Sequence, residues 1–178
     1  MRDVLLKNGS SLSIRPGTAE DAEAALEYLD KIASESPFLS FGPGEMQLTM
    51  EEEVEFLESF RGHDNKVLLM GWVDDELVCS ATLLGRTRPR MRHVAELGIS
   101  VTQKWWGQGV GRAMIQALLD WAGEQGVLKR IFLVTREDNK RGIALYESMG
   151  FEYEARLKRE TLLDGQFYDS FLYALLLE

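Results

Sequence analysis

The sequence is poor in the residues that form disulfides and hold metal ions. Its 178 residues include one cysteine, Cys79, and two histidines, His63 and His93. A lone cysteine excludes an internal disulfide, and its apolar, strand-like surroundings indicate a buried, unreactive thiol. The two histidines stand apart and belong to no cluster with the spacing of a metal site. We therefore expect neither a metal cofactor nor a cysteine nucleophile.

Long apolar runs and a positive net charge are also absent. No run is long enough to span a membrane, and residues 1–13 carry charges where a secretory signal needs an apolar core. The formal net charge of −9 disfavours nucleic-acid binding. We expect a cytoplasmic protein with no membrane or nucleic-acid partner. Five cations near a glycine-rich segment nevertheless suggest a polyanionic cofactor, namely Lys104, Arg112, Arg136, Lys140 and Arg141.

Hydrophobic periodicity and turn residues predict one α/β domain over residues 1–178 with a mixed sheet. Seven strands and four helices are expected, in the order β, α, α, β, β, β, α, β, α, β, β. The strands are predicted at Leu12–Arg15, Lys66–Val73, Glu76–Gly85, His93–Val101, Ile131–Thr135, Phe151–Leu163 and Gln166–Leu177. Helices are predicted to begin near Thr18, Thr49, Val110 and Asn139.

Two connections between these elements have unusual compositions. The loop Ser34–Leu48 contains proline and glycine together with Phe38, Phe41 and other apolar residues. It is either a wall of a substrate site or a loop packed on the core. The connection Arg86–Arg92 is basic and contains a proline.

A glycine-rich turn joins the strand at residues 93–101 to the next helix. It reads Trp105-Trp106-Gly107-Gln108-Gly109-Val110-Gly111-Arg112-Ala113. Glycines let backbone N–H groups turn toward a ligand, and a helix N-terminus adds unpaired donors and a positive dipole end. The turn fits neither the G-x-G-x-x-G dinucleotide fingerprint nor the P-loop pattern. It predicts a backbone cradle for phosphate oxygens, with a ligand-free glycine turn as the alternative.

Two segments resemble motifs of the GNAT superfamily of N-acetyltransferases. The glycine-rich turn resembles the acetyl-CoA pyrophosphate loop, Q/R-x-x-G-x-G/A, with Trp106 at its first position. Residues 139–151 resemble N-x-x-A-x-x-x-Y-x-x-x-G-F, with Gly142 in place of alanine. The motifs follow in the expected order with one strand between them. The C-terminal segment, residues 158–177, resembles the bacterial branch near ribosomal-protein and polyamine N-acetyltransferases.

This resemblance implies a GNAT fold with a mostly antiparallel sheet, and an enzyme that transfers the acetyl group of acetyl-CoA to a primary amine. The amine would attack the thioester directly in a ternary complex. The resemblance assigns pyrophosphate binding to the backbone of Gln108, Gly109, Val110, Gly111, Arg112 and Ala113. It assigns the pantetheine arm to the backbone of Leu97, Gly98 and Ile99 and to Asn139. Tyr146 would protonate the leaving thiolate; its alternative role is that of a core aromatic residue.

Two residues of the strand at 93–101 complete the expected site. Glu96 is a lone carboxylate on the face opposite Leu97 and is a candidate base for the ammonium proton. A salt bridge to Arg92 or His93, with deprotonation by water, is the alternative. Gly98 predicts a bulge or a close approach by a ligand. By the resemblance, such a bulge would separate this strand from the next and admit the thioester.

Three other functions stay open at this point. A GNAT-fold module could bind acyl-CoA without turnover, a nucleotide-dependent oxidoreductase could use the glycine turn, and an interaction module could use the apolar loop and the terminal hairpin. The acceptor could be a polyamine, an aminoglycoside, an amino acid or a protein N-terminus. Because the long terminal strands leave a sheet edge to cover, we also expect a homodimer.

Overall fold

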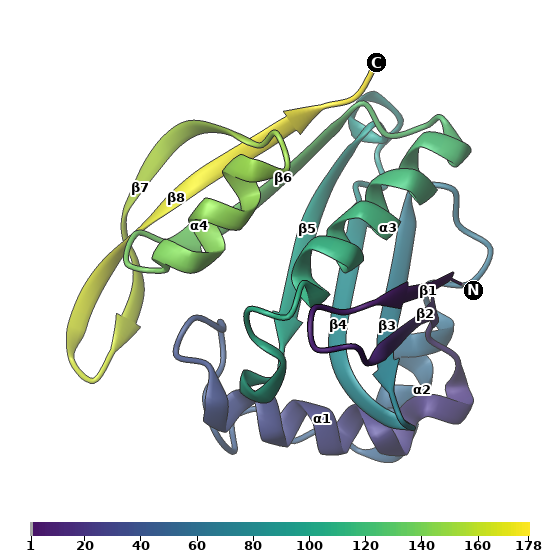
Figure 1. Ribbon diagram of the computed structural model, residues 1–178. Helices are drawn as coiled ribbons and strands as arrows, with labels where there is room; N and C mark the ends of the chain where they lie inside the picture. The colour runs from purple at the N-terminus through teal and green to yellow at the C-terminus, as the bar shows by residue number, and fades with distance from the viewer. Residues whose placement is uncertain (1) are drawn as a thin grey trace.

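The computed structural model describes residues 2–178 as one mixed sheet with helices on both faces (Figure 1). The strand order is β1-β2-β3-β4-β5-β6-β8-β7. The elements are β1 (Arg2–Leu5), β2 (Ser11–Pro16), α1 (Ala22–Glu35), α2 (Met50–Glu58), β3 (Lys66–Val73), β4 (Glu76–Gly85), β5 (Val94–Val101), α3 (Val110–Gln125), β6 (Arg130–Arg136), α4 (Lys140–Ser148), β7 (Glu152–Leu163) and β8 (Gln166–Leu176).

The sheet has eight strands, one more than the seven predicted. The additional strand is β1, which pairs antiparallel with β2 from Arg2 opposite Ile14 to Leu5 opposite Ser11. Three of its four residues are exposed and only Val4 is half-buried, so the segment lacks the alternation of apolar and polar residues that marks a strand. The other seven strands and the four helices lie close to their predicted positions.

The sheet opens into a wedge between β5 and β6. These strands are parallel and pair over only three positions, from Val94 opposite Arg130 to Glu96 opposite Phe132. Beyond Glu96, β5 continues along β4, and beyond Phe132, β6 continues along β8. Figure 1 shows the two strands separating toward the glycine turn that precedes α3. Among residues 2–178, no strand pairs with the backbone edges that face each other across this gap.

The predicted bulge at Gly98 is wrong, although the predicted separation of the strands is present. The β4–β5 register runs unbroken from Cys79 opposite Val101 to Gly85 opposite Ala95. The strands separate because β6 turns away to pair with β8, and the pairing with β5 ends two residues before Gly98.

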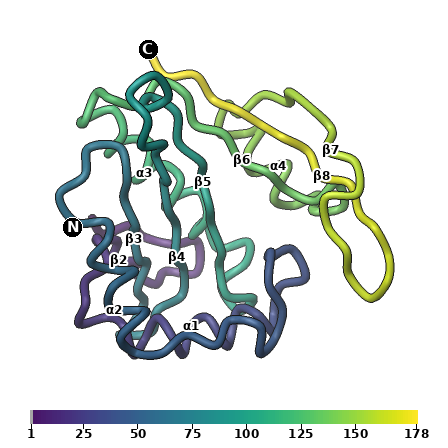
Figure 2. The backbone as a smooth tube through the Cα atoms, turned by 180° about the vertical axis from the view of Figure 1, so that it is seen from behind, coloured from purple at the N-terminus to yellow at the C-terminus, as the bar shows by residue number. Residues whose placement is uncertain are grey.

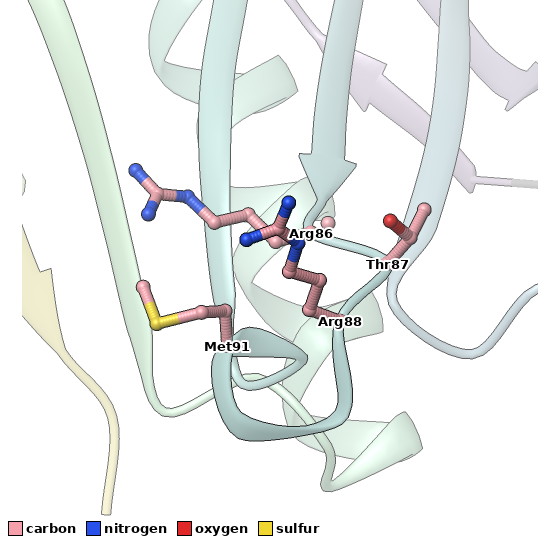
Figure 3. Close-up of a pocket in the computed structure, with 5 residues that line it drawn as sticks. Arg86, Thr87, Arg88 and Met91 are labelled. Carbon is pink, nitrogen blue, oxygen red and sulfur yellow. The ribbon is translucent and has the colours of Figure 1, made fainter.

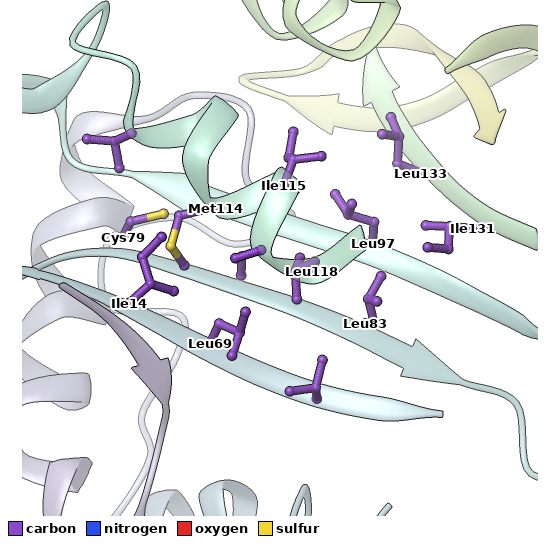
Figure 4. Packing of buried hydrophobic residues seen from close by; sticks show 14 of the residues in the cluster. Ile14, Leu69, Cys79, Leu83, Leu97, Met114, Ile115, Leu118, Ile131 and Leu133 are labelled. Atoms are coloured by element: carbon purple, nitrogen blue, oxygen red, sulfur yellow. The ribbon is translucent and has the colours of Figure 1, made fainter. Parts of the chain in front are cut away.

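Two hydrophobic clusters hold the helices on opposite faces of the sheet. On one face Met114, Ile115 and Leu118 of α3 pack on Leu83 and Leu97 (Figure 4). The same cluster includes Tyr146, so α3 and α4 cover one face together. On the other face α1 and α2 form a second cluster over β3. Figure 2 shows α1 crossing one end of this face, with much of β4 and β5 left uncovered.

Cys79 lies at the centre of the sheet and is fully buried. Burial raises the pKa of this thiol well above its usual range, because the thiolate would lose its hydration. We expect no reaction with a thiol-detecting disulfide reagent in the native protein at pH 8, and one equivalent after denaturation. Rapid labelling of the native protein would contradict this placement. An inert Cys79 would add no background to assays that detect a released thiol.

Candidate active site

The glycine turn has the backbone conformation that its sequence predicts. After β5, a short 3-10 turn leads to Gly107 and Gly109, whose φ angles are +75° and +98°. Gly109 is also the N-cap residue of α3 in the left-handed region. Side chains other than glycine are strained in this region. An ideal Cβ at either glycine would meet no other atom within 4 Å, so the space in front of the turn is open.

The open side of this turn carries unpaired backbone donors. The first hydrogen bond of α3 runs from the Ala113 N–H to the Gly109 carbonyl at 3.0 Å. The N–H groups of Val110, Gly111 and Arg112 therefore have no acceptor within the helix. The N–H of Gln108 lies 3.4 Å from the Trp105 carbonyl. Of the six predicted pyrophosphate donors, Gln108 and Ala113 are thus engaged, and no acceptor within residues 2–178 is found for the N–H groups of Gly109–Arg112.

The third glycine of the turn serves packing. Gly111 lies where α3 meets α4, and a Cβ there would lie 2.9 Å from Leu145 Cδ2. Nearby, the Arg112 guanidinium donates to the Ser148 hydroxyl at 2.6 Å. These contacts fix the start of α3 against α4, so the two sequence motifs are adjacent in the fold.

Trp106 occupies the position where the superfamily motif has glutamine or arginine, and it has a contact that the sequence does not reveal. Its indole N–H donates to the Val101 carbonyl at 2.6 Å. The Arg141 guanidinium stacks on its ring, 3.8 Å from the centroid. The contact joins the turn after β5 to the first turn of α4.

The backbone of Leu97, Gly98 and Ile99 lines the β5 side of the gap, as predicted. These residues pair with Leu83, Thr82 and Ala81 of β4. Their pairing with β6 has already ended, so the backbone groups that point away from β4 face the gap. An elongated ligand could form hydrogen bonds with this backbone edge in the way that an added strand would.

Asn139 caps α4. Its side-chain oxygen accepts from the Gly142 N–H at 3.1 Å, and its amide nitrogen donates to the Thr135 hydroxyl at 3.0 Å. A Cβ at residue 142 would lie 2.5 Å from the Asn139 amide nitrogen, which explains the glycine where the motif has alanine. The predicted bond from Asn139 to the pantetheine arm would therefore compete with these two contacts.

Tyr146 lies on α4 with its ring in the main core. The side chain is 8% exposed, and its ring contacts Phe151 edge to face at 6.3 Å between centroids. Burial raises the pKa of Tyr146 to about 12, so the phenol is neutral at pH 7. The hydroxyl makes no hydrogen bond to any other residue of the described chain, 2–178. The fold therefore uses the ring and leaves the donor available.

Glu96 lies on the opposite face of the sheet from Tyr146. Tyr146 packs in the cluster that includes Leu97, whereas Glu96 is exposed on the other face, opposite Phe132 and Leu84. The alternative of a salt bridge with Arg92 is not observed, because Arg92 pairs with Asp64 at 2.5 Å. Across residues 2–178, Glu96 has no ion-pair partner. The two candidate acid–base groups thus lie on opposite faces of the sheet.

Arg136 has a structural role that differs from the expected one. It is 6% exposed, pairs with Asp138 at 2.6 Å and donates to the Pro37 carbonyl at 2.7 Å. Its guanidinium also stacks on Tyr168 and lies near Phe38. The expectation that Arg136 serves a polyanionic cofactor is therefore wrong. Instead it ties the apolar loop Ser34–Leu48 to the end of β6 and to β8, on the Glu96 face.

Residues 26–151 match the Acetyltransferase (GNAT) family. The chain belongs to the GNAT acetyltransferase family. This membership confirms the predicted family and the predicted fold class. It also supports the predicted enzyme class, an acetyltransferase that uses acetyl-CoA as co-substrate. Within the described residues, 2–178, no group of three or more metal-binding side chains is present. No helix in this part of the GNAT chain is both long and apolar enough to cross a membrane.

Individual proteins support the same assignment. The L-amino acid N-acetyltransferase AaaT of Escherichia coli K12 is 31% identical over 106 residues, or 60% of this chain and 65% of AaaT. The ribosomal protein uS5-alanine N-acetyltransferase of the same strain is 35% identical over 83 residues, or 47% of this chain and 43% of that enzyme. The matches thus span less than two thirds of either relative. A GNAT acetyltransferase crystal structure from Streptococcus pneumoniae, 27% identical, covers 93% of this chain and 99% of its own with a TM-score of 0.91.

Proposed function

We propose that this GNAT protein transfers the acetyl group of acetyl-CoA to a primary amine, with both substrates bound at once. The observation that carries the proposal is the gap between β5 and β6, which has free donors at its end and candidate acid–base groups on its two faces. Of the two relatives named above, one is an L-amino acid N-acetyltransferase and the other is a ribosomal protein alanine N-acetyltransferase. Acetyl-CoA would approach from the α3–α4 face and the amine from the Glu96 face.

The cofactor half of the site suits an extended molecule with a diphosphate. The free N–H groups of Gly109–Arg112 and the positive end of α3 would bind the pyrophosphate oxygens. A cavity of about 330 Å³ adjoins the turn and is lined by Lys7, Gln108, Gly109 and Arg112 among others. The free edge at Leu97–Ile99 would bind the amide groups of the pantetheine arm.

The chemistry follows from the groups on the two faces. The amine nitrogen forms a bond to the thioester carbon, and the carbon–sulfur bond breaks to release a thiolate. Glu96 accepts one proton from the bound ammonium, which leaves the neutral amine that attacks; the nitrogen releases its second proton to solvent as the tetrahedral intermediate collapses. Tyr146 donates its phenolic proton to the thiolate and regains a proton from solvent. Orientation of the two substrates in the gap supplies much of the remaining acceleration.

Replacing Glu96 with glutamine should lower kcat/KM for the amine by about 10²-fold near neutral pH, because the variant cannot accept the ammonium proton. The loss should shrink as the pH rises and more of the amine is already neutral. Steady-state rates of thiol release from pH 6 to 10 measure both effects. Glu124→Gln, an exposed change near the end of α3, is the matched control. A Glu96→Gln variant with wild-type kcat/KM throughout this range would assign deprotonation to water.

We also propose that the protein is a homodimer and that it is located in the cytoplasm. The β7–β8 hairpin projects from the sheet (Figures 1 and 2), and Leu162 and Phe167 on it are more than half exposed. A second copy that covers these side chains would account for their exposure. Light scattering of the purified protein measures the predicted doubled mass.

A further inference from the structure

The basic connection between β4 and β5 lines a cavity that is separate from the one beside the glycine turn. This cavity measures about 440 Å³ and is lined by Gly85, Arg86, Thr87, Arg88 and Met91. Figure 3 shows the side chains of Arg86, Arg88 and Met91 around it. The connection therefore presents two guanidinium groups to one shared space.

Neither guanidinium group is neutralised by the protein. Arg86 and Arg88 form no ion pair with any other residue between 2 and 178, although the chain has a net charge of −9. Arg92, in the same connection, does have a carboxylate partner, Asp64. Both side chains are exposed, so water and salt screen their mutual repulsion in part, and an anion in the cavity would be attracted by both. Their planar donors match a carboxylate in particular.

The connection is held in place from inside the fold. Asn65 is buried, and its side-chain amide donates to the carbonyls of Arg86 and Arg92, at 3.1 and 3.2 Å. The Arg86 N–H donates to the Val94 carbonyl at 3.0 Å. Both ends of the connection are thereby fixed to the sheet, so the arginines project from an ordered base. The two exposed side chains therefore start from a fixed backbone, which lowers the entropy cost of binding a ligand between them.

This cavity adjoins the amine side of the proposed reaction. The Arg86 guanidinium lies over the Phe132 ring, 5.6 Å from its centroid. Phe132 pairs with Glu96 at the last position before the gap opens. Arg86, Phe132 and Glu96 thus share the face from which the amine would approach. The Arg86 guanidinium therefore lies beside the last paired position of β5 and β6, next to the start of the gap.

We infer that Arg86 and Arg88 bind the carboxylate of the acceptor, so that the acceptor is an amino acid whose amine reaches the gap beside Glu96. The inference rests on the proposed acetyl transfer and specifies its acceptor. Because the Arg86 guanidinium lies over Phe132, the strand partner of Glu96, a carboxylate bound there would hold an amine on the adjacent carbon near the start of the gap. In polyamines and aminoglycosides every charged group is positive, and the two arginines would repel these groups.

The test compares an amino acid with its own carboxamide, which keeps the amine and side chain but lacks the negative charge. A screen of the common L-amino acids for thiol release from acetyl-CoA first selects the best acceptor. We expect the wild-type kcat/KM to favour the acid over its carboxamide by about 10- to 100-fold, as for a lost charged hydrogen bond. Arg86→Gln and Arg88→Gln should each raise KM for the acid about tenfold and reduce this preference. KM for acetyl-CoA should stay unchanged.

Arg90→Gln is the matched control, because Arg90 belongs to the same connection but does not line the cavity. It should keep the wild-type preference. Equal rates with acid and carboxamide, a faster reaction with a polyamine or an acidic peptide, or equal effects of Arg86→Gln and Arg90→Gln would overturn the inference. Each of these outcomes leaves acetyl transfer intact. Failure of the proposed function has another signature, since acetyl-CoA would then react with no amine, whether or not it binds in calorimetry.

Discussion

Replacing Tyr146 with phenylalanine should lower kcat for acetyl transfer by about 10²-fold or more, because the variant has no proton to give to the thiolate. The ring lies in the core and its hydroxyl has no partner among residues 2–178, so the substitution removes only the donor. The dissociation constant for acetyl-CoA should change little. Steady-state kinetics and calorimetry on the same preparations separate the two quantities.

Tyr173→Phe is the matched control for Tyr146→Phe. Tyr173 is also buried in the main core, but its hydroxyl donates to Glu147 of α4 at 3.0 Å. Its loss should cost about 1 kcal/mol of stability and leave kcat near the wild-type value. Equal kcat for Tyr146→Phe and the wild type would show that the leaving thiolate needs no donor from this residue.

The phenolic proton of Tyr146 also predicts how kcat depends on pH. Burial raises the pKa of Tyr146 to about 12, and the neutral phenol is the active form. Protonation is therefore complete at neutral pH and would be lost only near pH 12. The kcat profile of the wild type should have no descending limb near pH 10, where an ordinary tyrosine ionises. A fall in kcat near pH 10 that is absent in the Tyr146→Phe variant would contradict the raised pKa of Tyr146.

Gly109→Ala should weaken acetyl-CoA binding by about 10- to 100-fold, the range expected when one charge-assisted hydrogen bond is lost. With φ at +98°, an alanine here strains the backbone and reorients the N–H groups that follow it. Its methyl group would also enter the open space in front of the turn. Calorimetric titration with acetyl-CoA measures the loss.

The control lies at the other end of the same helix. Gly126 is the C-cap residue of α3 in the left-handed region with φ at +70°, and a Cβ there would also meet nothing within 4 Å. Gly126→Ala should cost similar stability, about 1–2 kcal/mol, without changing the affinity for acetyl-CoA. If both variants bound acetyl-CoA as the wild type does, the glycine turn would not be the pyrophosphate site.

The parts of the site that lie within one continuous segment could be predicted from the sequence. The left-handed conformation at Gly107 and Gly109 follows from the glycines themselves, and the cap at Asn139 from its place before a helix. The face of Glu96 follows from strand alternation. Each of these features depends on residues within one or two turns of each other, where local rules hold.

Contacts between distant segments could not be predicted in this way. The stacking of Arg141 on Trp106 joins two residues that are 35 positions apart, and the Arg136 contact with Pro37 joins two that are 99 apart. No pattern within either segment specifies its partner. For the same reason nearness in sequence to a motif does not reveal the role of Arg136, whose guanidinium contacts Pro37 and Asp138.

The most direct test of the proposed function is thiol release from acetyl-CoA in the presence of an L-amino acid panel, with mass spectrometry of the acceptor. We predict that one amino acid gains a single acetyl group for each thiol released, at a rate that depends on enzyme concentration. Binding of acetyl-CoA without turnover on any amine would instead support a binding module of the same fold. If the protein neither bound acetyl-CoA nor released thiol from it with any amine, the assignment of the β5–β6 gap as an acetyl-transfer site would be contradicted.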